Sequence, residues 1–112
     1  MNYEELADLL KAISDPNRLK ILDVISCGGK RACDILEFFD FTQPTLSHHM
    51  KTLSEAELVN KSRDGRWIFY TINEEKADYI KQELSGLISD NGEKCLCQEM
   101  PDYEGCKKEE IV

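Results

Sequence analysis

The sequence predicts a mainly α-helical fold that contains one two-stranded β-hairpin. Apolar residues recur at helical spacings of three and four in successive segments between residues 3 and 58. The spacing changes to alternation over residues 59–72 and returns to helical spacing over residues 74–88. The predicted element order is therefore α-α-α-α-β-β-α, which a chain of 112 residues can build around a single core.

The first two helices are predicted from apolar stripes and from the residues that separate them. Asp15-Pro16 interrupts the first stripe, and an acidic N-cap followed by proline is a common way to begin a helix. Gly28-Gly29 ends the second helix. The two stripes consist of Tyr3, Leu6, Leu9, Leu10 and Ile13, and of Leu19, Leu22 and Ile25.

The next two helices have the form of a helix-turn-helix. A short helix ends near Phe39, and Thr42 is expected to cap a fourth helix that carries Pro44 in its first turn. This fourth helix is expected to bury Leu46, Met50 and Leu53 and to expose a polar face. A short helix, a tight turn and a polar-faced helix are what insertion into the major groove of DNA requires.

The segment after residue 58 is expected to form a hairpin, the wing of a winged helix-turn-helix. Its strands are residues 59–63 and 66–72, and Asp64-Gly65 between them favours a type I′ turn. Because a two-stranded ribbon is not stable alone, one alternating set must pack on the helices. The alternatives are Trp67 with Phe69, or Ile68 with Tyr70.

The closing helix over residues 74–88 is expected to stop at Asp90-Asn91-Gly92. The chain then changes composition, because the remaining residues are polar and carry three of its five cysteines. We therefore expect a DNA-binding and dimerisation domain over residues 1–90 and a cysteine-containing tail over residues 91–112.

Charge is distributed unevenly along the chain. The net charge is -8, but residues 73–112 hold 11 acidic and 5 basic residues, whereas residues 41–70 hold 3 and 4. The acidic total therefore does not exclude DNA binding by the central segment. The acidic amino terminus lacks the features of a signal peptide, and no apolar run is long enough to span a membrane, so we expect a cytoplasmic protein without membrane contact.

The polar face of the fourth helix and the hairpin tip are the candidate DNA-binding surfaces. Hydroxyl, amide and imidazole groups can contact base edges or phosphates, and lysine and arginine supply charge to the phosphates. A basic hairpin tip on an acidic protein favours this interpretation over an ordinary solvated face. The candidates are Gln43, Thr45, Ser47, His48 and Lys51 on the helix, and Lys61, Arg63 and Arg66 on the hairpin.

Three motifs in this order resemble the ArsR/SmtB family of metal-sensing winged-helix repressors. They are AISDPNRLKIL at 12–22, ACDILEFFDFTQPTLSHHMKTLSEAELV at 32–59 and RDGRWIFYTIN at 63–73. The resemblance implies a homodimer, joined through the first and last helices, that binds double-stranded operator DNA. It also implies a repressor that leaves its operator when an ion binds.

Two ion sites of that family have no counterpart in this sequence. An arsenic-sensing pattern near the third helix resembles Cys-Val-Cys-Asp-Leu, but here Arg31 replaces the first thiol and leaves Cys33 alone. A zinc and nickel pattern uses Asp and His on the last helix, yet residues 74–88 contain no histidine. We expect Cys27 and Cys33 to be small buried residues, as free cysteines often are.

The tail cysteines Cys95, Cys97 and Cys106 are therefore the candidate ion site. Three thiolates suit arsenic(III) or antimony(III), which bind three sulfurs in a pyramid. The alternatives are a zinc, cadmium or lead site completed by Cys33 or a carboxylate, a thiol-redox switch, and thiols without a function.

Two other classes of function compete with DNA binding. An enzyme with a Cys/His nucleophile is disfavoured because His48 and His49 lie on the predicted recognition helix and no elements remain to enclose a substrate. A pure interaction module, in which the acidic last helix pairs with another protein, is the second rival. We expect a DNA-binding regulator and no catalytic residues.

Overall fold

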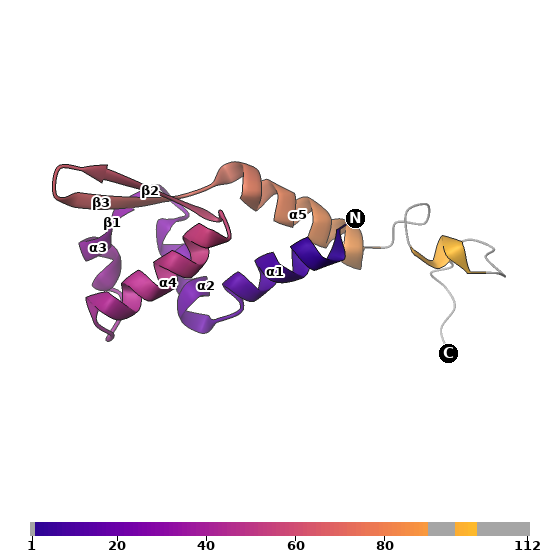
Figure 1. Ribbon diagram of the computed structural model, residues 1–112, viewed down its shortest axis with the longest axis horizontal. Helices are drawn as coiled ribbons and strands as arrows, with labels where there is room; N and C mark the ends of the chain where they lie inside the picture. The colour runs from indigo at the N-terminus through magenta and orange to yellow at the C-terminus, as the bar shows by residue number, and fades with distance from the viewer. Residues whose placement is uncertain (1, 90–95, 101–112) are drawn as a thin grey trace. The chain divides into compact units, whose positions relative to one another are not determined.

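The computed structural model describes residues 2–89 and 96–100 (Figure 1). The predicted order of helices and hairpin is confirmed, and one further strand precedes the third helix. No helix of the described residues is long and apolar enough to cross a bilayer. The elements are α1 (Tyr3–Ile13), α2 (Pro16–Ile25), β1 (Lys30–Arg31), α3 (Ala32–Leu36), α4 (Gln43–Glu55), β2 (Val59–Asp64), β3 (Trp67–Ile72), α5 (Glu74–Ile88) and the 3-10 helix η1 (Leu96–Glu99).

The chain divides into two compact units, Met1–Ile80 and Lys81–Val112. The first unit contains the four helices α1 to α4, the three strands and the first half of α5. Every contact described below lies within it. The predicted domain boundary at residue 90 falls outside the described residues and remains a prediction.

Side-chain caps explain where the first two helices begin. The Oδ1 atom of Asn2 accepts a hydrogen bond from the backbone N–H of Glu5 at 3.0 Å. Asp15 Oδ1 accepts from the backbone N–H groups of Asn17 at 2.8 Å and Arg18 at 3.2 Å. These bonds satisfy N–H groups that have no partner within the helix. Partial burial opposes ionisation of Asp15, but the two N–H donors outweigh it and hold the pKa of this carboxyl below its usual value.

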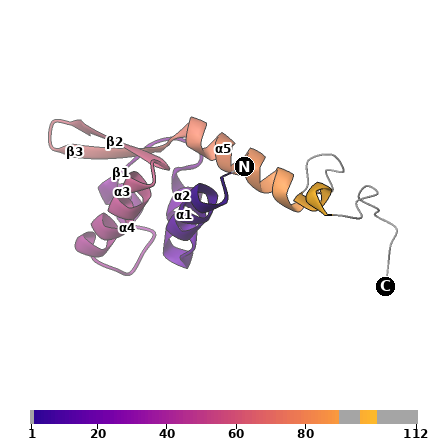
Figure 2. The same cartoon turned by 45° about the vertical axis from the view of Figure 1, so that its right-hand side comes forward.

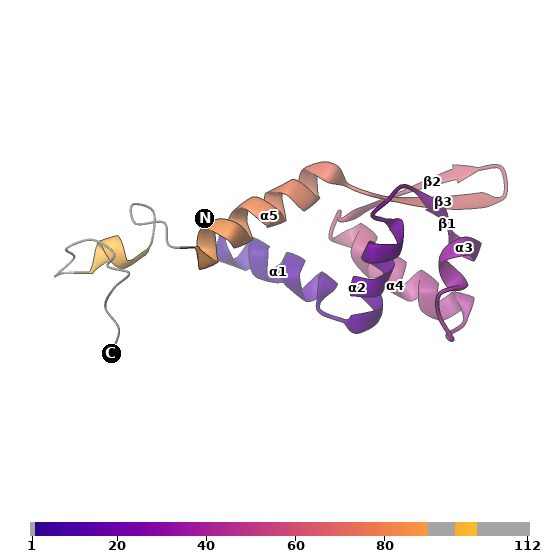
Figure 3. The ribbon, with the colours of Figure 1, turned by 180° about the vertical axis from the view of Figure 1, so that it is seen from behind.

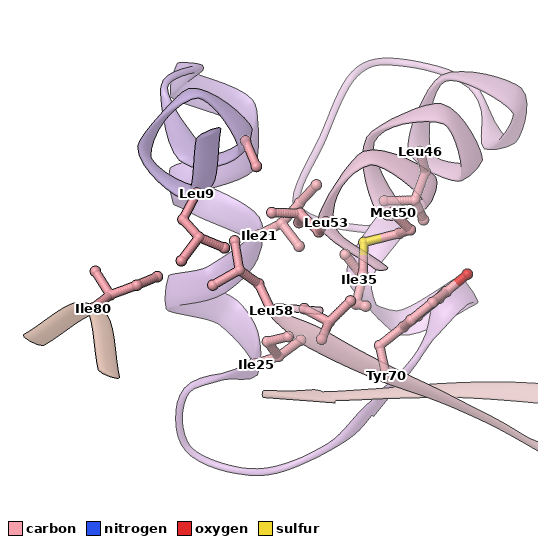
Figure 4. Packing of buried hydrophobic residues seen from close by; sticks show 12 residues of the cluster. Leu9, Ile21, Ile25, Ile35, Leu46, Met50, Leu53, Leu58, Tyr70 and Ile80 are labelled. Carbon is pink, nitrogen blue, oxygen red and sulfur yellow. The ribbon is translucent and has the colours of Figure 1, made fainter. Parts of the chain in front are cut away.

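The core is built on α2 and α4. In Figure 3, α2 lies between α1 on one side and α3 and α4 on the other, and α2 contacts all three helices. As predicted, α4 buries Leu46, Met50 and Leu53, and it also buries His49. Figure 4 shows these apolar side chains meeting residues of the other elements. The cluster includes Leu9, Ile21, Ile25, Ile35, Leu58, Tyr70 and Ile80.

The end of α4 is a Schellman turn whose left-handed residue is a glutamate. Glu57 has a φ of 61°. Its N–H donates to Ser54 O at 3.0 Å, and the N–H of Leu58 donates to Leu53 O at 3.0 Å. The Nδ2 atom of Asn73 donates to Glu57 O at 2.8 Å, so the residue before α5 fastens this turn.

The sheet has three antiparallel strands in the order β1-β3-β2. The two-residue strand β1 pairs Lys30 with Tyr70 and Arg31 with Phe69, a pairing that the sequence did not predict. Gly29 allows the approach, because a Cβ atom there would lie 2.7 Å from the Cγ2 atom of Thr71. The hairpin of β2 and β3 projects beyond α3 and α4 (Figures 1 and 2).

The hairpin turn differs from the predicted one. Asp64 pairs with Trp67, so the two loop residues are Gly65 and Arg66 rather than Asp64 and Gly65. Gly65 has a φ of 60°, whereas Arg66 does not have a positive φ. The type I′ prediction is wrong, because that turn needs positive φ at both positions, and glycine at the first position fits a type II′ turn.

The sequence left two alternatives for the hairpin face that packs on the helices, and the structure selects one of them. Tyr70 is buried and Ile68 is half-buried against the core, whereas Trp67 is exposed. The face of Ile68 and Tyr70 therefore meets the helices.

Candidate nucleic-acid interface

The outer side of α4 is polar and open to solvent. All five candidates on this helix are exposed: Gln43, Thr45, Ser47, His48 and Lys51. Thr42 is the N-cap residue of this helix, but its side chain makes no capping hydrogen bond, and its Oγ1 atom lies 3.5 Å from Thr45 Oγ1. The amino end of α4 therefore keeps both backbone N–H groups and side-chain hydroxyls available to an anion.

The turn between α3 and α4 is held by aromatic contacts. The rings of Phe39 and Phe41 stack with their centres 4.4 Å apart, and the ring of Phe41 lies 5.6 Å from that of His49. From α2, Lys20 Nζ donates to Phe38 O at 2.8 Å and lies 5.0 Å above the ring of Phe39. These contacts fix the angle at which α4 leaves the turn.

A second group of contacts joins α4 to α1 and α2 through Arg18. Its Nε atom donates to Ala12 O at 2.6 Å, and its Nη1 atom lies 3.2 Å from Nδ1 of His49. Because a guanidinium can only donate, Nδ1 of His49 must accept and carry no proton. Burial lowers the pKa of His49, as do the nearby charges of Arg18 and His48, while Asp15 acts in the opposite direction. His49 is thus a neutral structural residue of the recognition helix.

The basic residues of the hairpin are also exposed. Lys61 pairs directly with Tyr70, and Arg63 with Ile68, so both basic side chains lie on the sheet face that meets the helices. Arg66 lies in the loop, with its guanidinium carbon 5.3 Å from the ring centre of Trp67. The helix and the hairpin therefore present positive charge from two elements of one unit.

Arg31 lies on β1, beside the strand β3 of the hairpin. Its Nε and Nη2 atoms pair with the two carboxylate oxygens of Asp34 at 3.0 and 3.2 Å. Its guanidinium carbon lies 4.6 Å from the ring centre of Trp67. The hydrogen bond from Arg31 lowers the pKa of Asp34, and the same bond raises the pKa of Arg31. Arg31, which stands where the family pattern has its first thiol, is therefore held by contacts with both Asp34 and Trp67.

The expectation that Cys27 and Cys33 are buried is wrong, because both are exposed free thiols. Cys27 follows the last turn of α2, and α3 turns only Ile35 fully inward, which leaves Cys33 on its outer side. Cys95 and Cys106 lie outside the described residues, and for Cys97 only the backbone, in η1, is described. Within the described residues, no three His, Cys, Asp or Glu side chains are grouped so that they could hold a metal ion.

Two features of the interface were not found from the sequence. The sequence places His49 on the recognition helix, but its partner Arg18 is 31 residues earlier and no local pattern links them. The role of Arg31 was also missed, because its contact with Trp67 depends on the pairing of β1 with β3. Only the cap at Asp15 was predicted, from Asp15-Pro16 in the first motif.

Comparisons with known proteins agree with this architecture. The family model described as bacterial regulatory protein, arsR family, matches residues 15–61. The chain is 49% identical over 104 residues to the arsenical resistance operon repressor of Staphylococcus xylosus, covering 93% of this chain and 99% of that one. A repressor with the same name from Staphylococcus aureus is 48% identical over 98 residues, covering 88% and 93%.

A solved structure gives the same fold. The homodimeric winged helix-turn-helix DNA-binding domain of a possible ArsR-family regulator from Mycobacterium bovis superimposes with a TM-score of 0.63 at 26% identity. The match covers 72% of this chain and 76% of that one. The matched proteins are DNA-binding regulators, which confirms the predicted fold and the expectation of a non-enzymatic function.

Proposed function

The chain belongs to the ArsR family of bacterial transcriptional regulators, and from this premise we propose that it binds double-stranded operator DNA as a homodimer in the cytoplasm. The observation that carries the proposal is the shared exposure of the eight candidate residues on α4 and the hairpin. In this role α4 enters the major groove, Gln43, Thr45, Ser47 and His48 face the bases, and the basic residues contact phosphates.

Exposed apolar side chains support dimerisation. Tyr3 on α1 is 51% exposed, and on α5 Leu87 and Ile88 are 47% and 76% exposed. Large apolar side chains at helix surfaces are typical of contacts between subunits. A two-fold dimer would present two copies of α4 to half-sites about 34 Å apart along one face of the DNA.

Gel shifts and footprinting on the DNA upstream of the chain's own coding sequence test DNA binding. Lys61→Gln should lower affinity for all sequences and reduce the slope of log K against log salt by about 0.9 for each phosphate that is no longer neutralised. Gln43→Ala should instead relax base preference at one position of each half-site. Lys11→Gln on α1 removes the same charge elsewhere and should leave both properties unchanged. Equal affinity of the wild type for operator and random DNA would contradict the proposal.

We further propose that a thiophilic ion bound by Cys95, Cys97 and Cys106 releases the protein from its operator. The support is chemical: thiolates favour soft ions, three thiols match the coordination of arsenic(III) or antimony(III), and the relatives are named arsenical resistance operon repressors. In the binding step three thiols replace the three hydroxyl groups of arsenous acid, forming three As–S bonds and releasing three waters. No oxidation or reduction is involved.

Release experiments with different effectors separate this proposal from its alternatives. Operator-bound protein is titrated with arsenite, antimonite, zinc, cadmium, lead or a thiol oxidant. Release by arsenite and antimonite at the lowest concentrations is the expected result. Preferential release by zinc, cadmium or lead would indicate a site with a fourth ligand, and release by oxidant alone would indicate a disulfide switch.

A further inference from the structure

The surface between α4 and the hairpin contains a groove with a volume of about 420 Å³. Its polar lining comes from α4 and from both strands of the hairpin: Ser47, Lys51, Ser54, Glu55, Lys61 and Tyr70. Met50 and Ile68 form its apolar floor. The groove thus joins the two elements that the proposed function assigns to DNA.

Tyr70 is the unusual member of this lining. The side chain is only 5% exposed, and its hydroxyl forms no hydrogen bond with any residue that the structure describes. Among the described residues, every side-chain oxygen or nitrogen that is fully enclosed has a hydrogen-bond partner. Because the hydroxyl of Tyr70 has no partner, it is not fully enclosed and reaches the groove. Figure 4 shows the oxygen directed away from the apolar cluster. A buried tyrosine usually finds a partner for this group.

The partner that fits is an acceptor with negative charge. Burial raises the pKa of Tyr70, so the phenol keeps its proton and can donate it in a hydrogen bond. Lys61 lies directly across the strand pair from Tyr70, and Lys51 approaches from α4. The hydroxyl group of Ser54 completes the set of donors.

One acidic residue opposes an anion in the groove. Glu55 lies 4.0 Å from Lys51, measured from its Oε1 atom to Nζ, and both side chains are largely exposed. An exposed pair at this distance is weak and exchanges readily with other partners. With Lys51, Lys61 and Glu55 together, the groove retains a net positive charge.

We propose that this groove binds one backbone phosphate of the operator in each half-site, with the hydroxyl of Tyr70 as a direct donor to a phosphate oxygen. The inference rests on the proposed DNA-binding function and adds a contact to it. Lys51 and Lys61 flank the phosphate, so one phosphate would be held by the recognition helix and the wing together. Such a contact fixes the register of α4 in the major groove without reading a base.

The variant Tyr70→Phe tests the contact, because it removes one oxygen and retains the buried ring. A hydrogen bond to a charged acceptor predicts a loss of operator affinity of about tenfold or more for each half-site. The salt slope should stay unchanged, since a neutral hydroxyl releases no counterion. Thr71→Val is the matched control, because it removes a hydroxyl from the next residue of β3, on the opposite face. It should bind operator like the wild type.

Single methylphosphonate substitutions in the footprinted operator locate the phosphate. We expect one position in each half-site at which the substitution weakens the wild type strongly and weakens Tyr70→Phe much less. Equal losses for both proteins at every position, or unchanged affinity of Tyr70→Phe, would overturn the groove proposal while leaving DNA binding intact. If the wild type does not prefer operator DNA, the proposed function itself fails and the groove proposal with it.

Free inorganic phosphate carries the same acceptor oxygens and negative charge as a phosphate of the DNA backbone. Inorganic phosphate titrated into the DNA-free protein at constant ionic strength should give no saturable change in the NMR signals of Tyr70, because a single ion lacks the anchoring of a bound duplex. Saturable binding that Tyr70→Phe abolishes would make this a site for free anions and would contradict the assignment to the DNA backbone.

Discussion

The guanidinium carbon of Arg31 lies 4.6 Å from the ring centre of Trp67, which joins the start of α3 to the first residue of β3, next to the hairpin turn. The same guanidinium is held by both carboxylate oxygens of Asp34. A planar group that stacks and makes a two-point ion pair has little freedom to move. Arg31 therefore fixes the side of the wing opposite to the face that packs on α4.

We predict that Arg31→Ala weakens operator binding several-fold, because the wing loses its stacking partner. Arg31→Lys should recover little of this loss, since an ammonium group cannot reproduce the planar stack and the two-point pair. The same variants should shift the emission of Trp67, the single tryptophan of the chain, towards a more hydrated environment. Operator affinity and emission as in the wild type for Arg31→Ala would contradict this role.

The hydrogen bond from Arg18 to His49 predicts a pH dependence of stability. The pKa of His49 is lowered in the folded protein, so below the ordinary value of about 6.5 the unfolded chain takes up a proton that the folded chain does not. Stability is therefore retained above pH 6.5 or so and decreases as the pH falls from there towards the folded pKa.

His49→Asn removes this titration while its Oδ1 atom can still accept from Arg18. Chemical denaturation between pH 5 and 8 should give a free energy of unfolding that depends less on pH for this variant than for the wild type. The difference should appear below about pH 6.5, the ordinary pKa of histidine. His48→Asn removes the exposed neighbouring imidazole, the smallest of the causes that lower the pKa of His49, and should retain most of the pH dependence of the wild type. An identical pH dependence of wild type and His49→Asn would show that His49 does not contribute.

Glu57 offers a test of backbone strain at the end of α4. Its φ of 61° suits glycine better than any other residue. Glu57→Gly and Glu57→Ala both lose the ion pair with Lys76, 3.9 Å from carboxylate to ammonium, but only glycine relieves the left-handed conformation. The glycine variant should be more stable than the alanine variant by about 1 kcal/mol. That difference corresponds to a melting temperature higher by roughly 4–8 °C. Equal melting temperatures would exclude strain at this turn.

The fold could be predicted because its elements have clear local patterns. The stripes of α1 and α4, the cap at Asp15 and the alternation over β3 each occupy one continuous segment. The strand β1 could not be found this way, because two residues carry no periodicity and exist as a strand only through pairing with β3. The turn type was missed for a similar reason: a shift of one residue in pairing decides which residues form the loop.

The charged residues of the candidate interface could be predicted from the sequence, but the contacts that hold the interface in place could not. Exposure of Lys51, Lys61 and Arg66 follows from an outward helix face and a hairpin tip. The contacts of His49 with Arg18 and of Arg31 with Trp67, and the groove around Tyr70, are made by tertiary packing, and no sequence spacing reveals them. The exposure of Cys27 and Cys33 likewise depends on which way short segments turn, against the general tendency of cysteine to be buried.

The most direct test of the central claim is the operator affinity measured with and without arsenite for three proteins. The wild type should lose about 5- to 150-fold in affinity on arsenite addition, the range of a coupling of about 1–3 kcal/mol. A variant with Cys27→Ser and Cys33→Ser should respond in the same way. A variant with Cys95→Ser, Cys97→Ser and Cys106→Ser should bind the operator equally well and keep its affinity in arsenite. Release of this last variant at the arsenite concentration that releases the wild type would contradict the assignment of the sensor to the tail.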